Sequence, residues 1–223
     1  MTGVICLQGG DEFTPACREI DRGWLARVPA GTVGIAPLAC AAGVEYRTAA
    51  HNGSEYLRDL GVADIIVAPE PNLSLDGAVR AILDAAIVVI PGGSPARIRR
   101  RVVGTAIGGA LRAHLAGGGT VIGASAGAMV LGALMLVPDE EMQIHTGLAA
   151  VPDVLVLPHY DRRRDAVVDK VAAQIAQVSD AMTILGIPAC AGVLYGDGEP
   201  LAFGDEDCWR FTADREPEII PHA

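Results

Sequence analysis

The sequence predicts an α/β protein built on a doubly wound, mostly parallel sheet, with an antiparallel extension in its C-terminal part. Three observations support this fold class. Short apolar runs alternate with segments of helical spacing up to Met142, which is typical of repeated βαβ units. The chain contains 27 glycines, which suit tight strand–helix turns. After Met142 the apolar runs are separated by Gly-Asp turns, which favour antiparallel hairpins.

The elements of the first part follow from these runs. Strands are expected in short apolar segments, at residues 3–8, 32–38, 64–68, 86–90 and 120–124. Helices are expected between them, at residues 14–28, 53–60, 76–85 and 95–115. Asp76 is a plausible N-cap for the third helix. Pro95 suits the first position of the fourth.

The second part contains shorter apolar runs, at residues 154–157, 182–185, 192–195 and 201–203. The turns at residues 196–198 and 204–205 predict two hairpins. No shift in composition marks a boundary. We therefore expect a single α/β domain over residues 1–223.

The composition restricts the classes of function. Half of the chain is hydrophobic (51%) but only 4% is aromatic, so Ala, Val, Leu and Ile must form the core. A formal charge of −10 argues against nucleic acid or an anionic membrane as partner.

The apolar run 120–137 is broken by Gly123, Ser125 and Gly127, so it is not expected to span a membrane. The N-terminus lacks a basic region and a long apolar stretch, and we expect a cytoplasmic protein.

The cysteines and histidines do not predict a metal site. Five cysteines are scattered without a C-x-x-C pair, at positions Cys6, Cys17, Cys40, Cys190 and Cys208. We expect buried free thiols in a reducing compartment. No ligand spacing is present, and no Gly-x-Gly-x-x-Gly follows the first strand. No metal, nucleotide or other cofactor is therefore expected.

The strongest functional motif is Gly123-x-Ser125-x-Gly127, at the end of an apolar strand. It matches the nucleophile elbow G-x-S-x-G, in which small flanking residues let a strained strand–helix turn close. Ser125 Oγ would then stand beside backbone N–H groups that favour a developing negative charge. The alternative is an ordinary tight strand–helix junction in a chain rich in Ala and Gly.

A nucleophilic serine needs a base. The histidines are His51, His114, His145, His159 and His222. We expect His51 in a loop, His114 on a helix surface and His222 near a mobile C-terminus. Of the other two, His159 directly follows the predicted strand 154–157, and sites in open α/β sheets gather at the carboxyl ends of strands. His159 is therefore the preferred base; a purely structural histidine is the alternative.

A second glycine turn, Gly92-Gly93, follows the fourth predicted strand. Backbone N–H groups of Gly92 or Gly93, together with that of Ala126, could form an oxyanion hole. An ordinary strand–helix turn explains the same glycines equally well.

Three motifs together resemble a known family: Ile90-Pro91-Gly92-Gly93, Gly123-x-Ser125-Ala126-Gly127-Ala128 and Pro158-His159-Tyr160. They are similar to the peptidase E / cyanophycinase family of serine peptidases, and residues 8–12 resemble the glycine loop after that family's first strand. The resemblance implies a class I glutamine-amidotransferase-like (flavodoxin-like) fold. It also implies hydrolysis of short peptides or amides next to an acidic, aspartyl residue, with Ser125 as nucleophile and His159 as base. The implied partner is a small peptide substrate. The sequence leaves open whether the chain also forms a homodimer.

The third member of a triad is uncertain from the sequence. Many family members carry a glutamate in a Gly-Ile/Leu-x-Glu run, but the corresponding residue here is Ala189. Asp139 is the nearest alternative acid, and Asp161 and Asp165 lie close to His159 in the sequence. Loss of the acid would also fit a catalytically silent amidotransferase-like module that only binds a ligand. An α/β-hydrolase is less expected, because it needs a histidine late in the chain and the only late one is His222. A glutamine amidotransferase is less expected still, because its nucleophile is a cysteine and this motif carries a serine.

Two arginine runs remain. Arg162, Arg163 and Arg164 follow the candidate base, and Arg163, with Arg162 next, is the residue expected to bind a substrate carboxylate. Salt bridges to nearby aspartates are the alternative. The run at residues 97–101 is expected on an exposed helix face.

Overall fold

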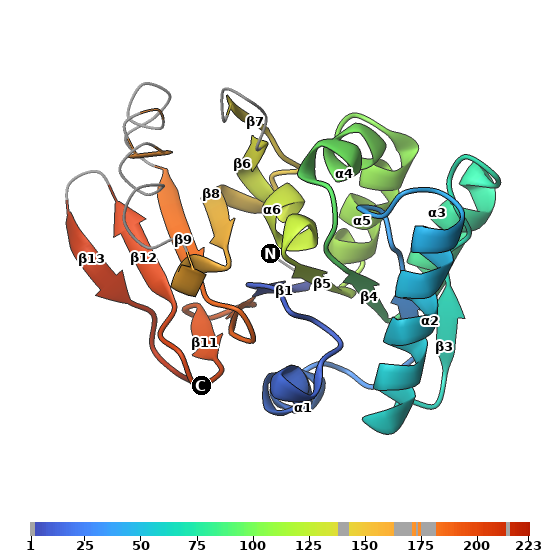
Figure 1. Cartoon of the computed structure of the whole chain (residues 1–223), viewed down its shortest axis with the longest axis horizontal. Coiled ribbons are helices and arrows are strands. Elements are labelled where there is room, and N and C mark those ends of the chain that lie inside the picture. The colour runs from blue at the N-terminus through green and yellow to red at the C-terminus, as the bar shows by residue number, and fades with distance from the viewer. Residues whose placement is uncertain (1–2, 138–142, 163–170, 173, 175–181, 213–214) are drawn as a thin grey trace.

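The computed structural model describes residues 3–137, 143–162, 171–172, 174, 182–212 and 215–223 (Figure 1). The described strands form two sheets. The first sheet has the order β11-β10-β1-β5-β4-β2-β3. Its strands are β1 (Val4–Gln8), β2 (Val33–Ile35), β3 (Ile65–Val67), β4 (Ile87–Ile90), β5 (Thr120–Ala124), β10 (Gly192–Tyr195) and β11 (Leu201–Phe203). The strands β1 to β5 are parallel, and β10 and β11 extend this sheet in antiparallel orientation.

Helices cover both faces of the first sheet, as a doubly wound fold requires. They are α1 (Arg18–Leu25), α2 (Val44–Asp59), α3 (Leu75–Asp84), α4 (Pro95–Val102), α5 (Ala106–Ala116) and α6 (Ala126–Leu131), with the short 3-10 turns η1 (Pro15–Cys17) and η2 (Tyr160–Arg162). Successive side chains of a strand point to opposite faces. Cys6 accordingly packs in a cluster with residues of α1 and α2, whereas Ile5 and Leu7 pack with α3 to α6. The expected fold class is confirmed.

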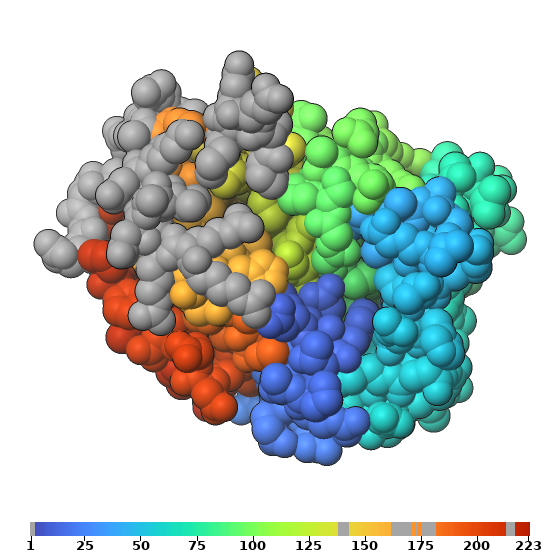
Figure 2. Space-filling model, in the orientation of Figure 1, coloured from blue at the N-terminus to red at the C-terminus, as the bar shows by residue number. Residues whose placement is uncertain are grey.

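The second sheet has the order β13-β12-β9-β8-β6-β7. Its strands are β6 (Gly132–Val137), β7 (Gln143–Thr146), β8 (Val151–Pro158), β9 (Thr183–Ile187), β12 (Trp209–Thr212) and β13 (Arg215–Ile219). The strands β6, β8 and β9 are parallel, with antiparallel strands on either side. In Figure 2 the N-terminal segment, in blue, lies between the orange and red surface of the C-terminal part and the cyan and green surface around α2 to α5.

Several local predictions differ from the structure, and α2 begins at Val44 rather than at residue 53. The turn at residues 196–198 does join a hairpin, β10 and β11. The turn at residues 204–205 does not, because the chain passes there from the first sheet to the second, where β12 pairs with β9. The predicted helix 95–115 is two helices, interrupted at Gly104, whose φ is +72°. The third helix is capped by Ser74 rather than Asp76, because the Ser74 side chain accepts the Gly77 N–H.

The expectation of free thiols throughout is wrong. Cys17 and Cys190 form a disulfide between residues 173 positions apart, although no C-x-x-C spacing reveals the pair. It joins η1 to the turn after β9. The other cysteines, Cys6, Cys40 and Cys208, are free and buried. Within the described part of the chain, no helix is both long and apolar enough to cross a membrane.

Candidate active site

Ser125 occupies a strained turn between β5 and α6. Its φ is +50° and its ψ is −114°, a conformation that costs free energy for any residue with a side chain. The turn can close only because its flanks are small: a Cβ at Gly123 would lie 2.5 Å from the carbonyl oxygen of Gly127. The Ser125 N–H donates to the carbonyl oxygen of Gln8 at 3.0 Å. The backbone thus has the geometry that the sequence motif predicts for a nucleophile elbow.

His159 comes from the second sheet and meets Ser125 at the carboxyl edge of the first. It follows β8 directly, and its N–H donates to the carbonyl oxygen of Gly9 at 2.9 Å. The distance between His159 Nε2 and Ser125 Oγ is 3.2 Å. In the tautomer that carries its proton on Nδ1, the imidazole can accept the serine proton. The two residues expected to form the nucleophile and base therefore lie within hydrogen-bonding distance.

Gly10 shapes the position of the imidazole. Its φ is +126°, which residues with a side chain rarely adopt. A Cβ at Gly10 would lie 2.5 Å from His159 Nε2 and 2.9 Å from Nδ1, so any side chain there would displace the ring. The loop after β1 therefore holds His159 through the Gly9 carbonyl group and through the space left at Gly10.

Of the N–H groups expected to form an oxyanion hole, that of Gly92 binds the carboxylate of Glu12 in this structure. Its N–H donates to Glu12 Oε1 at 2.6 Å. A Cβ at Gly92 would lie 3.0 Å from Ser125 Cβ, so this amide is next to the serine. Gly93 has a φ of +139° and packs against the Ala39 carbonyl group, and Ala126 is fully buried directly after Ser125. The Gly92 amide is thus oriented toward a negatively charged oxygen beside Ser125.

The remaining predicted residues are placed as follows. Asp139 and Arg163 lie outside the described residues, and of Arg162 only the backbone, in η2, is described. In the second arginine run, Arg97 donates to the Ala39 carbonyl oxygen at 2.8 Å and Arg101 to that of Cys40 at 2.8 Å. These two side chains hold the segment after β2 and are not simply an exposed face.

Two other histidines lie in different surroundings from those that the sequence predicts. His51 lies on α2 rather than in a loop. His114 is buried, not exposed, and its Nε2 lies 3.0 Å from the Thr120 carbonyl oxygen. Burial lowers the pKa of His114, and the hydrogen bond to Thr120 opposes this effect.

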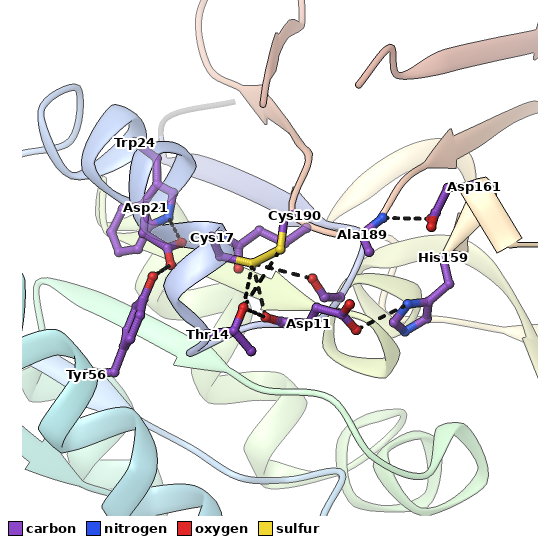
Figure 3. Close-up of a disulfide and its surroundings, with 12 residues drawn as sticks. Asp11, Thr14, Cys17, Asp21, Trp24, Tyr56, His159, Asp161, Ala189 and Cys190 are labelled. Atoms are coloured by element: carbon purple, nitrogen blue, oxygen red, sulfur yellow. Dashed lines mark hydrogen bonds and ion pairs between the residues drawn. A yellow bond between two sulfur atoms is a disulfide. The ribbon is translucent and has the colours of Figure 1, made fainter. Parts of the chain in front are cut away.

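Two acidic residues beside the site, Asp11 and Glu12, received no role from the sequence. Asp11 Oδ1 lies 3.9 Å from His159 Nδ1 (Figure 3). The signal that could have found them is their position: they follow β1 within four residues, at the carboxyl edge where α/β sites gather.

Comparison with known proteins identifies a family for most of the chain. The sequence profile of peptidase family S51 matches residues 35–199. Among curated proteins no match is found.

Solved structures resemble this chain over most of its length. A crystal structure of a peptidase from an acI-B1 Actinobacterium has a TM-score of 0.74 and 19% identity, with 99% of this chain and 94% of the other covered. A crystal structure of a putative peptidase E protein from Listeria monocytogenes EGD-e has a TM-score of 0.63 and 16% identity, with 92% and 99% covered. At these identities the likeness concerns the fold.

Proposed function

Because the chain belongs to peptidase family S51 and is thus a serine-type peptidase, we propose that it cleaves short peptides or amides next to an aspartyl residue through an acyl-enzyme. The observation that supports this most directly is the 3.2 Å distance between Ser125 Oγ and His159 Nε2. A strained serine at this distance from an imidazole fits nucleophilic catalysis.

The reaction follows from these two side chains. Ser125 Oγ attacks the carbonyl carbon of the scissile amide, and its proton passes to His159 Nε2. The tetrahedral intermediate then collapses, the C–N bond breaks, and the imidazolium returns the proton to the leaving amine. Water, deprotonated by His159, next attacks the ester, which releases the acid product and restores Ser125.

Backbone amides would hold the negative charge of the tetrahedral intermediate. The N–H groups of Gly93 and Ala126 would do so, joined by that of Gly92 once its amide is free of Glu12. That the Gly92 N–H binds a carboxylate at 2.6 Å supports its ability to bind an oxyanion.

The substrate class rests on the family motifs rather than on a bound ligand. The peptidase E-like combination of Ser125 and His159 with the Gly92-Gly93 turn supports a preference for aspartyl dipeptides. Arg163, followed by Arg162, is the proposed ligand of the substrate carboxylate, since guanidinium groups bind carboxylates in two-point contacts.

Hydrolysis of a dipeptide panel tests this function. Purified protein should release amino acids from Asp-Leu and Asp-Ala faster than from Asn-Leu and Leu-Ala, whose first residues lack the acidic group. Ser125→Ala should reduce the rate by roughly 10⁴-fold or more. A lack of aspartyl preference would contradict the substrate class, and activity retained in Ser125→Ala would contradict the mechanism.

One observation favours a second candidate function, a silent module that binds an acidic ligand. Ala189 stands at the position of the family glutamate, and its N–H is bound by Asp161 Oδ1 at 2.9 Å. This alternative predicts that Ser125→Ala leaves ligand affinity unchanged and that no dipeptide is hydrolysed, even at high protein concentration.

A further inference from the structure

The second ring nitrogen of His159 is exceptional in this structure. Nδ1 is buried and has no hydrogen-bond partner among the described residues, while Nε2 faces Ser125. Burial of an unpaired polar atom is unfavourable, and which nitrogen of a histidine carries the proton is set by the bond that the other makes. The site therefore lacks a close acceptor at the atom where a Ser-His pair needs one.

Asp11 is the carboxylate that faces this nitrogen. Its Oδ1 lies 3.9 Å from Nδ1, with the two side chains directed toward each other (Figure 3). The Asp11 backbone has a φ of +58°, and its carbonyl oxygen accepts the Thr14 hydroxyl proton at 2.8 Å. Asp11 directly follows Gly9 and Gly10, which hold His159. The loop after β1 thus both positions the imidazole of His159 and places a carboxylate beside it.

The carboxylate of Asp161, which is close to His159 in the sequence, binds a backbone amide instead. Asp161 Oδ1 accepts the Ala189 N–H at 2.9 Å, on the turn where family members carry their glutamate. Ala189 itself has only a methyl group. Asp11, from the opposite end of the chain, is therefore the carboxylate that the described structure places at Nδ1.

We propose that Asp11 is the positioning acid of this enzyme and replaces the glutamate that is lost at Ala189. Its carboxylate holds the Nδ1–H tautomer, which directs the free electron pair of Nε2 to Ser125. When Nε2 takes the serine proton, Asp11 stays ionised and stabilises the imidazolium. The 3.9 Å separation closes as this charge develops, since catalytic hydrogen bonds are often long before substrate binds. The inference rests on the proposed Ser-His mechanism.

The solvent exposure of the two side chains sets how much rate should be lost when Asp11 is replaced. The side chains of His159 and Asp11 are 23% and 36% exposed, so water screens their attraction more than in a fully buried triad. We expect Asp11→Asn to slow acylation of Ser125 by about 10- to 100-fold, less than the roughly 10⁴-fold loss known for a buried triad aspartate.

The tautomer of His159 gives a direct test that needs no substrate. In 15N-labelled protein at pH 8, two-bond 1H–15N correlation should show His159, assigned by its loss in His159→Gln, mainly as the Nδ1–H form. Asp11→Ala, or Asp11→Ser if the first variant does not fold, should shift it toward the Nε2–H form. An unchanged tautomer in a folded variant would overturn the proposal.

A second measurement follows the reactivity of Ser125. The rate of Ser125 labelling by a fluorophosphonate should fall about 10- to 100-fold in Asp11→Asn. Asp11→Glu should retain most of the rate. Asp161→Asn, which can still accept the Ala189 N–H, is the matched control and should label as the wild type does. Equal labelling rates in Asp11→Asn and wild type would contradict the role. If the labelled wild type cleaves no aspartyl dipeptide, the proposed function fails while the result on Asp11 stands.

Discussion

The imidazole of His159 fills the space that a side chain at Gly10 would occupy. A Cβ there would lie 2.9 Å from Nδ1 and 2.5 Å from Nε2, closer than non-bonded atoms approach. The loop after β1 and the end of β8 belong to different sheets, so this contact joins the two halves of the candidate site.

Gly10→Ala should therefore displace His159 and remove activity. A misplacement of about 1 Å can cost roughly 100-fold in rate, and we expect at least that loss in kcat/KM. Gly61→Ala is the matched control, because Gly61 also has a positive φ, +94°, but nothing within 4 Å of its Cβ position. The control should lose only about 1–2 kcal/mol of stability and keep its kcat/KM. Similar kcat/KM values for the two variants would show that the Gly10 contact does not position the base.

Glu12 should restrain the reaction, because its carboxylate occupies the Gly92 amide. Glu12→Ala frees this donor and removes a negative charge beside the site where an oxyanion forms. One such donor can contribute roughly 100-fold or more to kcat, so we expect labelling of Ser125 to accelerate about 3- to 30-fold. Glu12→Gln keeps an acceptor without the charge and should give an intermediate rate. A slower Glu12→Ala would show instead that the carboxylate supports the loop.

The Cys17–Cys190 disulfide should stabilise the protein. It closes a long stretch of chain, and loss of a native disulfide typically costs about 2–5 kcal/mol. For a chain of this size we expect reductant to lower the Tm by roughly 5–15 °C. The double variant Cys17→Ser/Cys190→Ser should melt at one temperature with or without reductant.

Thiol counting provides the check on this disulfide. Alkylation of denatured, unreduced protein should modify Cys6, Cys40 and Cys208 only, and prior reduction should expose all five cysteines. Five modified cysteines without reduction would show that the bond is absent from the isolated protein.

His114 should make stability depend on pH. Its pKa is lowered by burial, so the unfolded chain takes up a proton at a higher pH than the native protein does. The native state therefore has its full advantage above the unfolded value of about 6.5 and loses it as the pH falls toward the lower native pKa. The loss is at most about 1.4 kcal/mol per pH unit.

Urea unfolding between pH 7.5 and 5 measures this dependence. His114→Gln should flatten the dependence of the free energy of unfolding on pH, although its stability at pH 7.5 will be lower. His51→Gln, on α2, should leave the slope as in wild type. An unchanged slope in His114→Gln would assign the dependence to other groups.

Much of the fold could be predicted because it depends on local patterns. Short apolar runs predict β1 to β5 within a few residues, and the Gly-Asp-Gly turn at residues 196–198 predicts the β10–β11 hairpin. The division into two sheets could not be predicted, since it depends on which edge each later strand joins. The break at Gly104 was also missed, because the apolar spacing continues through it.

The site divides in the same way. Ser125 and His159 were predictable because a strained serine turn and a strand end have sequence signatures. Asp11 and Glu12 reach His159 and Gly92 from an irregular loop, and the Cys17–Cys190 pair forms across nearly the whole chain. Such contacts depend on tertiary packing and leave no spacing in the sequence.

Ser125 is the proposed nucleophile, and His159 is the base proposed to activate it. Reaction with a fluorophosphonate, followed by intact mass and peptide mapping, tests this proposal most directly. We expect one adduct per chain on Ser125, none in Ser125→Ala, and labelling slowed by about 10²-fold or more in His159→Gln. No adduct on Ser125 of the folded wild-type protein, or equal labelling in His159→Gln, would contradict it.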